Sequence, residues 1–560
     1  MATNLPSRRN AVMKTARKSP SKDMLTVSPV VLCTILGILA MVFAATRRSK
    51  LPLPPGPPKL PLVGNLFDVP STFQWQTYAR WSKQYDSDII HLNLAGKSVI
   101  VLSSLEATDA LLEKRSSLYS DRDALTMVTE LMGWYFNIGA GLMKYGDEWR
   151  THRRLFNQAF NVKTSRQYEP QELTGTHALL VRLLSSPEGF MDHFRQMAGE
   201  IIMSVAYGID VLPSEDPYVT LAHKAVQTFS IASVPGVYLV VRFMPAIATI
   251  YVIVLTWILR TPSPILKRIP RWFPGAGFKR QAEEWLKLSR GMLELPFAET
   301  KRQMESGTAP PSFTADSLNA LNDPDKQPYY KEHHVQQTAG TMYIGGADTT
   351  VSALGTFVLA MLANPTAQKK AQAEIDSFTG GRHLPSFEDE ASLPYVSALV
   401  KEVMRWENVT PFGVPHLLVT EDEYRGYRLP AGSLVVGNTW AILHDENVYP
   451  DPHAFKPERF LLDGKPNSAV KNPEAAFGFG RRQCPGRHMA LSSIWITVAS
   501  ILATFDISKA VDEDGRAIEP SYEYLSGLIS TPLPFKCSFT PRSQEAVVLI
   551  EAAVKDDHSL

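Results

Sequence analysis

The chain has 560 residues, of which 44% are apolar and 20% are charged, and its formal net charge at pH 7 is +1. This composition is typical of a globular protein and excludes a largely disordered chain, and the near-neutral balance gives no reason to expect nucleic-acid binding. The three cysteines, Cys33, Cys484 and Cys537, are too few and too scattered for a disulfide framework, and their spacing does not match a zinc site.

The N-terminal part of the chain predicts a membrane anchor. Residues 25–45 carry no charge and are long enough to cross a bilayer as one helix, and a basic cluster follows at 47–50. The apolar run is long for a signal peptide, and no small-residue cleavage site precedes the basic cluster. We therefore expect a retained, single-pass transmembrane anchor over 25–46 rather than a cleaved leader.

The residues on either side of this anchor bear on its orientation. Basic residues lie on both flanks of the apolar run, which leaves the orientation open. Translation from Met24, with 1–24 as an upstream extension, would leave only the cluster at 47–50, on the cytosolic side. The sequence LPLPPGPPKLPLVGN then ends a proline-rich hinge at 47–65, because proline fixes its own φ and restricts the residue before it.

The rest of the chain predicts one mainly helical domain with a minor β component, over 66–545, followed by a C-terminal tail at 546–560. Residues 91–104 (HLNLAGKSVIVLSS) predict a β-hairpin with its turn at 95–97, and Ser104 is expected to cap a helix that carries Leu111 and Leu112. A β-rich patch is expected at 423–440. Apolar residues recur at helical spacing in 171–208, 279–304, 331–362, 364–378, 393–406 and 487–504.

One segment does not fit the pattern around it. VRFMPAIATIYVIVLTWILRTPS, at 241–263, is almost wholly apolar from 250 to 259. Arg242 and Pro245 leave it short for a second membrane span. Two explanations remain equal: a membrane-dipping insertion near a substrate entrance, or residues translated from a retained intron.

The sequence FGFGRRQCPG, at 477–486, predicts a thiolate that binds haem iron. Cys484 would ligate the iron, and Arg482 would pair with a haem propionate. Gly480 and Gly486 would let the backbone turn tightly and approach the flat macrocycle. A helix that starts near Gly486 would point its positive N-terminal end at the sulfur. A purely structural cysteine would not require these residues and Phe477 together.

FGFGRRQCPG resembles the haem-binding signature of the cytochrome P-450 monooxygenases, F-x-x-G-x-R-x-C-x-G, and matches it at every constrained position. Glu402 and Arg405, in KEVMRW, match the E-x-x-R pair of that family. Arg459, in FKPERF, matches the arginine that completes a network with them behind the haem. The resemblance implies the P-450 fold, with one large haem domain behind an N-terminal transmembrane helix. It also implies haem b, with Cys484 as the axial ligand of the iron.

The resemblance assigns further residues to the two sides of the haem. GGADTT, at 345–350, lies in the middle of the helix expected at 331–362, where its two glycines cost up to about 1 kcal/mol each. In the family this stretch crosses over the haem, and the resemblance implies that Asp348 and Thr349 direct protons to the oxygen-binding side. Trp149 and Arg153, in GDEWRTHRR, and His416, in PFGVPH, match propionate-binding positions.

Candidate substrate contacts follow from position in the family. They are mostly apolar or aromatic, so an apolar small molecule is the expected substrate. The amino-acid sequences of the motifs resemble those of fungal microsomal members of the family that act in specialised-metabolite pathways. The expected contacts are 131–137, Ile344, Ala347, 410–414 and 527–529.

No flavin or nicotinamide motif occurs in the sequence, so the electrons are expected from a separate NADPH-dependent flavoprotein reductase. An acidic flavodoxin-like domain would bind a basic face on the cysteine side. The residues expected in that face are Arg150, Arg153, Arg154, Arg481 and Arg487.

The sequence as a whole predicts a membrane-anchored haem-thiolate monooxygenase, with its haem domain on the cytosolic side of the endoplasmic reticulum. It would insert one atom of O2 into the substrate and reduce the other to water. One alternative is a haem-thiolate isomerase or dehydratase that needs no external electrons, and another is a non-catalytic haem binder. The intact pair of Asp348 and Thr349 argues against both alternatives.

Overall fold

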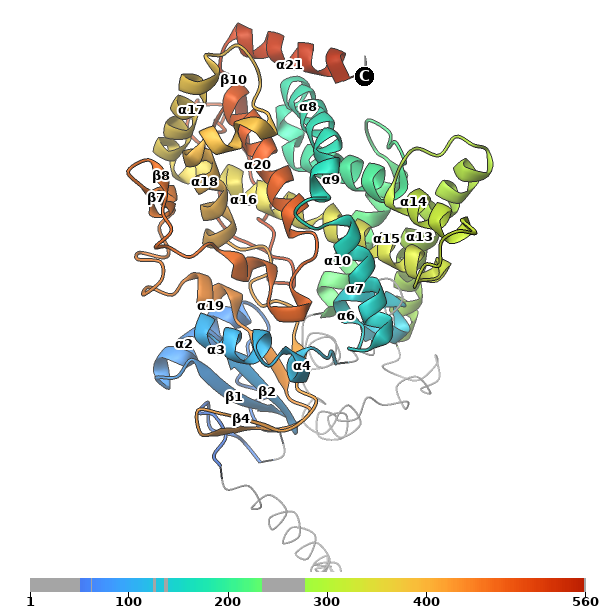
Figure 1. Ribbon diagram of the computed structural model, residues 1–560. Helices are drawn as coiled ribbons and strands as arrows, with labels where there is room; N and C mark the ends of the chain where they lie inside the picture. Colours follow the sequence, from blue (N-terminus) through green and yellow to red (C-terminus); the bar gives the residue numbers. More distant parts are fainter. Residues whose placement is uncertain (1–50, 62, 124–126, 135–138, 234–276, 558–560) are drawn as a thin grey trace, which may run out of the picture. The chain divides into compact units, whose positions relative to one another are not determined.

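The structure is a computed structural model that describes residues 51–61, 63–123, 127–134, 139–233 and 277–557. The chain divides into two compact units, 1–52 and 53–560, and nearly all of the described residues belong to the second, which is mainly helical (Figure 1). The expected N-terminal extension, the anchor at 25–46 and the atypical segment at 241–263 lie outside the described residues.

The largest sheet has four strands in the order β1-β2-β6-β3. Strands β1 and β2 form the expected hairpin, in which Ala95 and Gly96 both take positive φ, at 50° and 94°, as a tight two-residue turn requires. Strand β6 runs parallel to β2 and antiparallel to β3. The strands are β1 (Ile89–Leu94), β2 (Lys97–Leu102), β3 (His416–Leu417) and β6 (Leu434–Gly437). Three two-stranded ribbons join β4 (Asp422–Tyr424) to β5 (Tyr427–Leu429), β7 (Leu461–Leu462) to β8 (Lys465–Pro466), and β9 (Phe505–Lys509) to β10 (Cys537–Pro541).

Helices make up most of the rest of the unit. Ser104 caps the short helix α3 (Leu105–Thr108) as expected, because its hydroxyl oxygen accepts the N–H of Ala107 at 3.0 Å. The other helices are α2 (Gln74–Gln84), α4 (Ser116–Tyr119), α6 (Gly139–Leu142), α7 (Asp147–Ala159), α8 (Glu169–Ser185), α9 (Phe190–Tyr207), α10 (Pro217–Ser233), α13 (Gly277–Glu305), α14 (Phe313–Asn322), α15 (Glu332–Ala347), α16 (Thr349–Ala363), α17 (Pro365–Thr379), α18 (Pro394–Trp406), α19 (Thr439–Leu443), α20 (Arg487–Thr504) and α21 (Gln544–Asp557). Helices α13, α17, α18 and α20 confirm four of the expected ranges.

Two of the expected helical ranges are each divided into two helices. The range 171–208 is interrupted where Pro187, which has no N–H to donate, begins a short 3-10 turn between α8 and α9. The range 331–362 is interrupted at Asp348, whose φ and ψ of −117° and −17° lie outside the helical values. The hydroxyl of Thr349 donates to the carbonyl oxygen of Gly345 at 2.6 Å and so satisfies a group near the end of α15.

Helices α15 and α16 run through the core. Helix α15 packs against α9, α13 and α14, whereas α16 packs against α9, α18 and α20. In the part of the chain that the structure describes, 332–363 is the one helical stretch long and apolar enough to span a bilayer, and 83% of its most apolar window is buried. It is therefore a core element. Helix α21, which covers most of the expected tail, packs on α8 and buries Ile550.

Candidate functional site

The loop that carries Cys484 is closed by its own main chain. The N–H of Cys484 donates to the carbonyl oxygen of Phe477 at 2.8 Å, and the N–H of Gln483 donates to that of Gly480 at 3.0 Å. Gly480 has a φ of +57°, and a Cβ there would stand 2.0 Å from the carbonyl oxygen of Leu112. Only glycine fits this position, as the signature requires. The loop leads directly into α20.

Cys484 lies in a partly exposed loop, although its thiol is held in a buried environment. Burial raises the pKa of the Cys484 thiol above its ordinary value, while the Gly486 N–H and the nearby guanidinium groups of Arg153 and Arg487 lower it. The residue as a whole is partly exposed. At Gly486, two residues further on, a Cβ would meet no neighbouring described atom within 4 Å. The loop after the cysteine is therefore not close-packed.

Three basic side chains converge in the interior near this loop. Arg482 donates from Nε to the carbonyl oxygen of Ser120 at 2.8 Å, and its guanidinium lies 4.6 Å from the ring centroid of Trp149. Arg122 donates from Nη1 to the carbonyl oxygens of Val414 and Pro415 at 2.7 and 2.8 Å. The ring of His416 donates from Nδ1 to the carbonyl oxygen of Tyr119 at 2.8 Å.

Burial and neighbouring positive charges lower the pKa of all three groups. Burial and the charge of Arg482 hold the pKa of Arg122 well below its ordinary value. Burial lowers the pKa of Arg482 to about 9, although the carboxylate of Asp121 raises it. Burial, Arg122 and Arg482 likewise lower the pKa of His416. Such a concentration of buried positive charge favours an anionic ligand.

Helix α7 reaches the cysteine loop through Arg153. Its Nη1 donates to the carbonyl oxygen of Gln483 at 2.6 Å, directly before Cys484. Trp149, one turn earlier on the same helix, is 3% exposed and stacks against Arg482. The two residues expected to bind a propionate thus lie against the loop and the basic cluster.

The break between α15 and α16 presents polar groups beside open space. At Gly346 a Cβ would stand 2.9 Å from the side chain of Ile202, so this glycine permits close packing on α9. At Gly345 a Cβ would meet no atom of the described residues within 4 Å. The Thr349 hydroxyl donates its proton to the Gly345 carbonyl, so its lone pairs remain available as acceptors.

Asp348 is held by two side chains from other helices. Its Oδ1 lies 3.3 Å from Nδ1 of His223 on α10 and 3.8 Å from Nε of Arg195 on α9. The Asp348 side chain is 12% exposed. His223 and Arg195 also line a polar cavity of about 470 Å³. Asp348 is therefore connected through these partners to a water-accessible space.

Glu402, Arg405 and Arg459 form one buried network. Arg405 donates from Nε and Nη2 to the two carboxylate oxygens of Glu402 at 2.8 and 2.9 Å, and Arg459 donates to them from Nε at 3.1 and 3.0 Å. Glu402 and Arg405 are fully buried. The main-chain N–H of Lys456 adds a bond of 2.7 Å to Glu402. Two segments 57 residues apart are thereby tied together.

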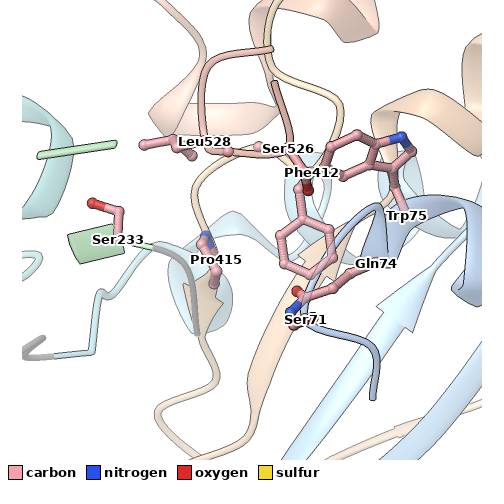
Figure 2. A pocket seen from close by; sticks show the side chains of 10 residues that line it. Ser71, Gln74, Trp75, Ser233, Phe412, Pro415, Ser526 and Leu528 are labelled. Carbon is pink, nitrogen blue, oxygen red and sulfur yellow. The ribbon is translucent and has the colours of Figure 1, made fainter. Parts of the chain in front are cut away.

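Two of the segments expected to contact substrate meet at a small cavity of about 30 Å³. Figure 2 shows Phe412 between Ser526 and the side chains of Gln74 and Ser71. Ser233, the last residue of α10, completes the opposite wall. Of the other expected contacts, Ile344 and Ala347 are buried on α15, and residues 135–137 lie outside the described residues. The cavity is lined by Ser71, Gln74, Trp75, Ser233, Phe412, Gly413, Pro415, Ser526, Gly527 and Leu528.

Comparisons with known proteins identify the family. The family model described as cytochrome P-450 matches residues 54–539. The chain belongs to the cytochrome P-450 family. Cytochrome P-450 monooxygenase 98 of Postia placenta is 46% identical over 526 residues, covering 93% of this chain and 96% of the relative. Cytochrome P-450 monooxygenase ple1 of Rhodocybe pseudopiperita is 44% identical over 520 residues, covering 92% and 94%. The tryptamine 4-monooxygenase of Psilocybe cyanescens is 40% identical over 504 residues, covering 89% and 94%.

This cytochrome P-450 is a haem-thiolate monooxygenase, related to those of fungal secondary metabolism, and its cofactor is haem with a cysteine thiolate on the iron. The residues in the structure fit that cofactor. Cys484 lies in a partly exposed loop, and the Gly486 and Gly345 positions border open space. The basic cluster matches two propionate anions in sign and in hydrogen-bonding type.

Arg122 is the cluster member that the sequence did not reveal. It lies in SDRD, where an arginine between two acidic residues is typical of a surface ion pair. Its side chain is 4% exposed and reaches main-chain groups almost 300 residues away in sequence. Only the fold identifies Arg122 as a member of the cluster, because it brings Val414 and Pro415, which precede β3, against the segment that carries Arg122.

Proposed function

We propose that this cytochrome P-450 oxidises an apolar small molecule of fungal specialised metabolism, with electrons from an NADPH-dependent flavoprotein reductase. The observation that carries the proposal is the break at Asp348, where Thr349 presents its hydroxyl oxygen beside open space and Asp348 lies beside His223 and Arg195. An enzyme that splits O2 needs protons at this place, whereas an isomerase or a non-catalytic haem binder does not.

Haem with a thiolate ligand supplies the activation of O2 and the transfer of oxygen to the substrate. The chain's own residues bind the group and manage protons. Cys484 would ligate the iron, and Arg122, Arg482 and His416 would receive the propionates. Arg153 holds the cysteine loop through the Gln483 carbonyl.

Protons would arrive through Asp348. His223 lines the polar cavity and lies 3.3 Å from the Asp348 carboxylate. Oδ1 of Asp348 would take the proton from Nδ1 of His223. Asp348 directly precedes Thr349 in the chain, so the proton is then next to the Thr349 hydroxyl. The Thr349 oxygen then accepts a hydrogen bond from the group that carries this proton and so orients it. It can act as an acceptor because its own proton is donated to the Gly345 carbonyl. This path stays separate from the small cavity around Phe412.

Electrons would arrive over the cysteine side. Tyr145 is placed between Arg150 and Arg481, and its hydroxyl bonds to Arg481. Burial raises the pKa of Tyr145, but the two arginines lower it further, so the net direction is down. Arg154 lies over the ring of Tyr329 at 4.4 Å. These ordered positive groups suit an acidic partner, and Arg150→Glu with Arg154→Glu would raise the KM for the reductase.

We also propose that 25–46 anchors the protein in the endoplasmic reticulum membrane, with the haem domain cytosolic. The support is the uncharged length of this segment and the basic residues that follow it. Membrane fractionation with protease protection tests it: the haem domain should be digested in intact microsomes. N-terminal peptide mass spectrometry tests the start at Met24, since recovery of residues 1–23 would exclude it.

The function is tested by reconstitution with the reductase. Product should require NADPH, O2 and the reductase together, and untargeted metabolite comparison of expressing and control cells would identify the substrate. The assayed panel should include apolar terpenoids and also tryptamine, because one relative is named for its action on that amine. Product formed without NADPH would favour the isomerase, and no product from any extract would favour the non-catalytic binder.

A further inference from the structure

Three histidines and one glutamate gather outside the haem site. Glu148 and His152 lie near the N-terminal end of α7, and His333 and His334 lie in the first turn of α15. These two helices pack against each other (Figure 1). None of the four residues has a role in the oxidation derived above.

The four side chains converge on one carboxylate oxygen. Oε1 of Glu148 lies 3.0 Å from Nε2 of His334, 3.3 Å from Nε2 of His333 and 3.8 Å from Nε2 of His152. The ligand atoms of Glu148, His333 and His334 all lie within 4.8 Å of one another. Two ligands that are each about 2.0–2.1 Å from a tetrahedral ion stand about 3.3 Å apart, so the spacing is close to that of a metal site.

Two of the imidazole nitrogens are buried and face this oxygen without satisfying it. The Nε2 atoms of His152 and His334 make no hydrogen bond of acceptable geometry within the described part of the chain. The His152 side chain is fully buried, and that of His334 is 8% exposed. Buried polar atoms without a partner are rare in native proteins, and a bound metal ion would satisfy both nitrogens at once.

His152 lies on the buried side of the cluster. Its Nδ1 is 2.8 Å from the hydroxyl of Thr338, and with the proton on Nδ1 the lone pair of Nε2 points towards Glu148. In that tautomer the imidazole lone pair and the carboxylate repel each other unless a positive ion lies between them.

We propose that Glu148, His333 and His334, with His152 beside them, bind a divalent transition-metal ion of the zinc class. Imidazole nitrogens and a carboxylate oxygen are the ligands that Zn²⁺, Ni²⁺ and Cu²⁺ accept. Nδ1 of His334 accepts the N–H of Lys331 at 2.9 Å. A metal bound at Nε2 requires the His334 proton on Nδ1, so the bond from the Lys331 N–H is lost, and that N–H, at the exposed start of α15, would bond to water instead. The Glu148 and His333 side chains are about half exposed, so the ion enters from solvent.

Such an ion would join α7, which carries Trp149 and Arg153, to α15, which leads to Asp348. A ligand that binds only the folded state raises its stability by mass action. Zn²⁺ should therefore raise the Tm of the protein without altering the haem spectrum, because none of the four residues is among those expected to bind the haem.

The test uses the untagged, full-length, haem-loaded protein in detergent, freed of metals with a chelator. Calorimetry and equilibrium dialysis with ZnCl2 should find one site per haem, weakened at least ten-fold by His333→Ala and by Glu148→Gln. Both residues are half exposed, so either variant alone suffices if the other fails to fold. His383→Ala is the matched control, because His383 is exposed and lies in the loop after α17, outside the cluster.

Copper EPR of the ferric protein, with the spectrum of the copper-free ferric protein subtracted, supplies a second readout. Nitrogen hyperfine splitting should be present in the wild type and in His383→Ala, and reduced in His333→Ala. A wild-type protein with no saturable Zn²⁺ site would overturn the proposal. So would equal Zn²⁺ affinity in the wild type and the two cluster variants.

Discussion

Nη1 of Arg153 donates a 2.6 Å hydrogen bond to the main-chain carbonyl oxygen of Gln483, the residue before Cys484. Helix α7 thereby holds the loop that presents the sulfur. Burial lowers the pKa of Arg153, while the nearby Cys484 raises it and Arg487 lowers it. The guanidinium of Arg153 therefore holds the cysteine loop in addition to its expected contact with a haem propionate. The sequence motif alone does not reveal this structural role.

Replacing Arg153 by alanine should loosen the cysteine loop. The carbonyl of Gln483 would lose its partner, and because it is only partly buried we expect the lower end of the ~1–3 kcal/mol that an unsatisfied buried acceptor costs. We expect a lower free energy of unfolding and faster transfer of haem to apomyoglobin. The unfolding free energy and the haem-transfer rate of Arg153→Lys should lie between those of the wild type and of Arg153→Ala, because lysine keeps the positive charge. Equal haem-transfer rates in all three proteins would show that the bond does not position the loop.

Cys484→Ala should abolish the thiolate signature of the enzyme. The ferrous carbonyl complex of the wild type should show the red-shifted Soret band that sulfur ligation causes, and the variant should not. Cys537→Ala is the control, because Cys537 is buried on β10, where burial raises its pKa to about 12. A normal band in Cys484→Ala would end the assignment of this sulfur as the iron ligand.

Thr349→Ala should uncouple NADPH oxidation from product formation. The variant loses the hydroxyl oxygen that is expected to orient proton donors, and with it the bond to the Gly345 carbonyl. Product per NADPH should fall several-fold, and hydrogen peroxide should rise in proportion, with substrate affinity nearly unchanged. Thr349→Ser retains the hydroxyl and should remain coupled. Wild-type coupling in Thr349→Ala would refute the role.

Glu172→Gln should stabilise the protein at high pH but not at low pH. Burial raises the pKa of Glu172 from 4.5 to about 8, although the hydroxyl of Ser492 bonds to Oε1 at 3.0 Å. Between these two values the folded state holds a proton that the unfolded state has lost, so stability falls as pH rises. Glutamine does not ionise.

We expect a gain of ~4 kcal/mol for Glu172→Gln at pH 8, since the pKa rises from 4.5 to about 8 and each pKa unit corresponds to about 1.4 kcal/mol. The gain should disappear near pH 4.5, the ordinary value for this group. Urea unfolding of both proteins at the two pH values measures it. A pH-independent difference would mean that Glu172 is ionised in the folded state.

Deleting 241–263 should leave a folded, haem-loaded enzyme, because family-like sequence flanks the segment on both sides. The carbonyl spectrum of the deletion variant checks this. Sequenced cDNA that lacks these codons would identify a retained intron, whereas cDNA that contains them, with weaker membrane binding of the variant, would identify a lipid-facing insertion. Loss of haem incorporation contradicts both.

The sequence predicted best those features that are local or that come from strict motifs. Gly480 takes the tight turn that the motif implied, although the group that a Cβ would meet in the described structure is the carbonyl oxygen of Leu112, and the approach to the haem stays a prediction. The structure also brings Glu402, Arg405 and Arg459 together as the motif order implied. The hairpin at 91–104 was predictable because its turn residues are adjacent in sequence.

Features that depend on distant contacts were not predictable. Arg122 became a member of the basic cluster only because the fold buries it, and Glu148 meets His333 across 185 residues of sequence. The helix break at Asp348 was missed for a different reason. Apolar periodicity continues through the break, while the side-chain bond from Thr349 that replaces a helical one leaves no mark on the pattern.

The break at Asp348 has a mechanical consequence. A helix whose backbone angles change at one residue can bend there, and Asp348 is the one residue between α15 and α16. Helix α15 packs against α9, α13 and α14, whereas α16 packs against α9, α18 and α20. A bend at Asp348 would therefore move α13 and α14 relative to α18 and to α20, the helix that follows the thiolate loop, with α9 in contact with both halves.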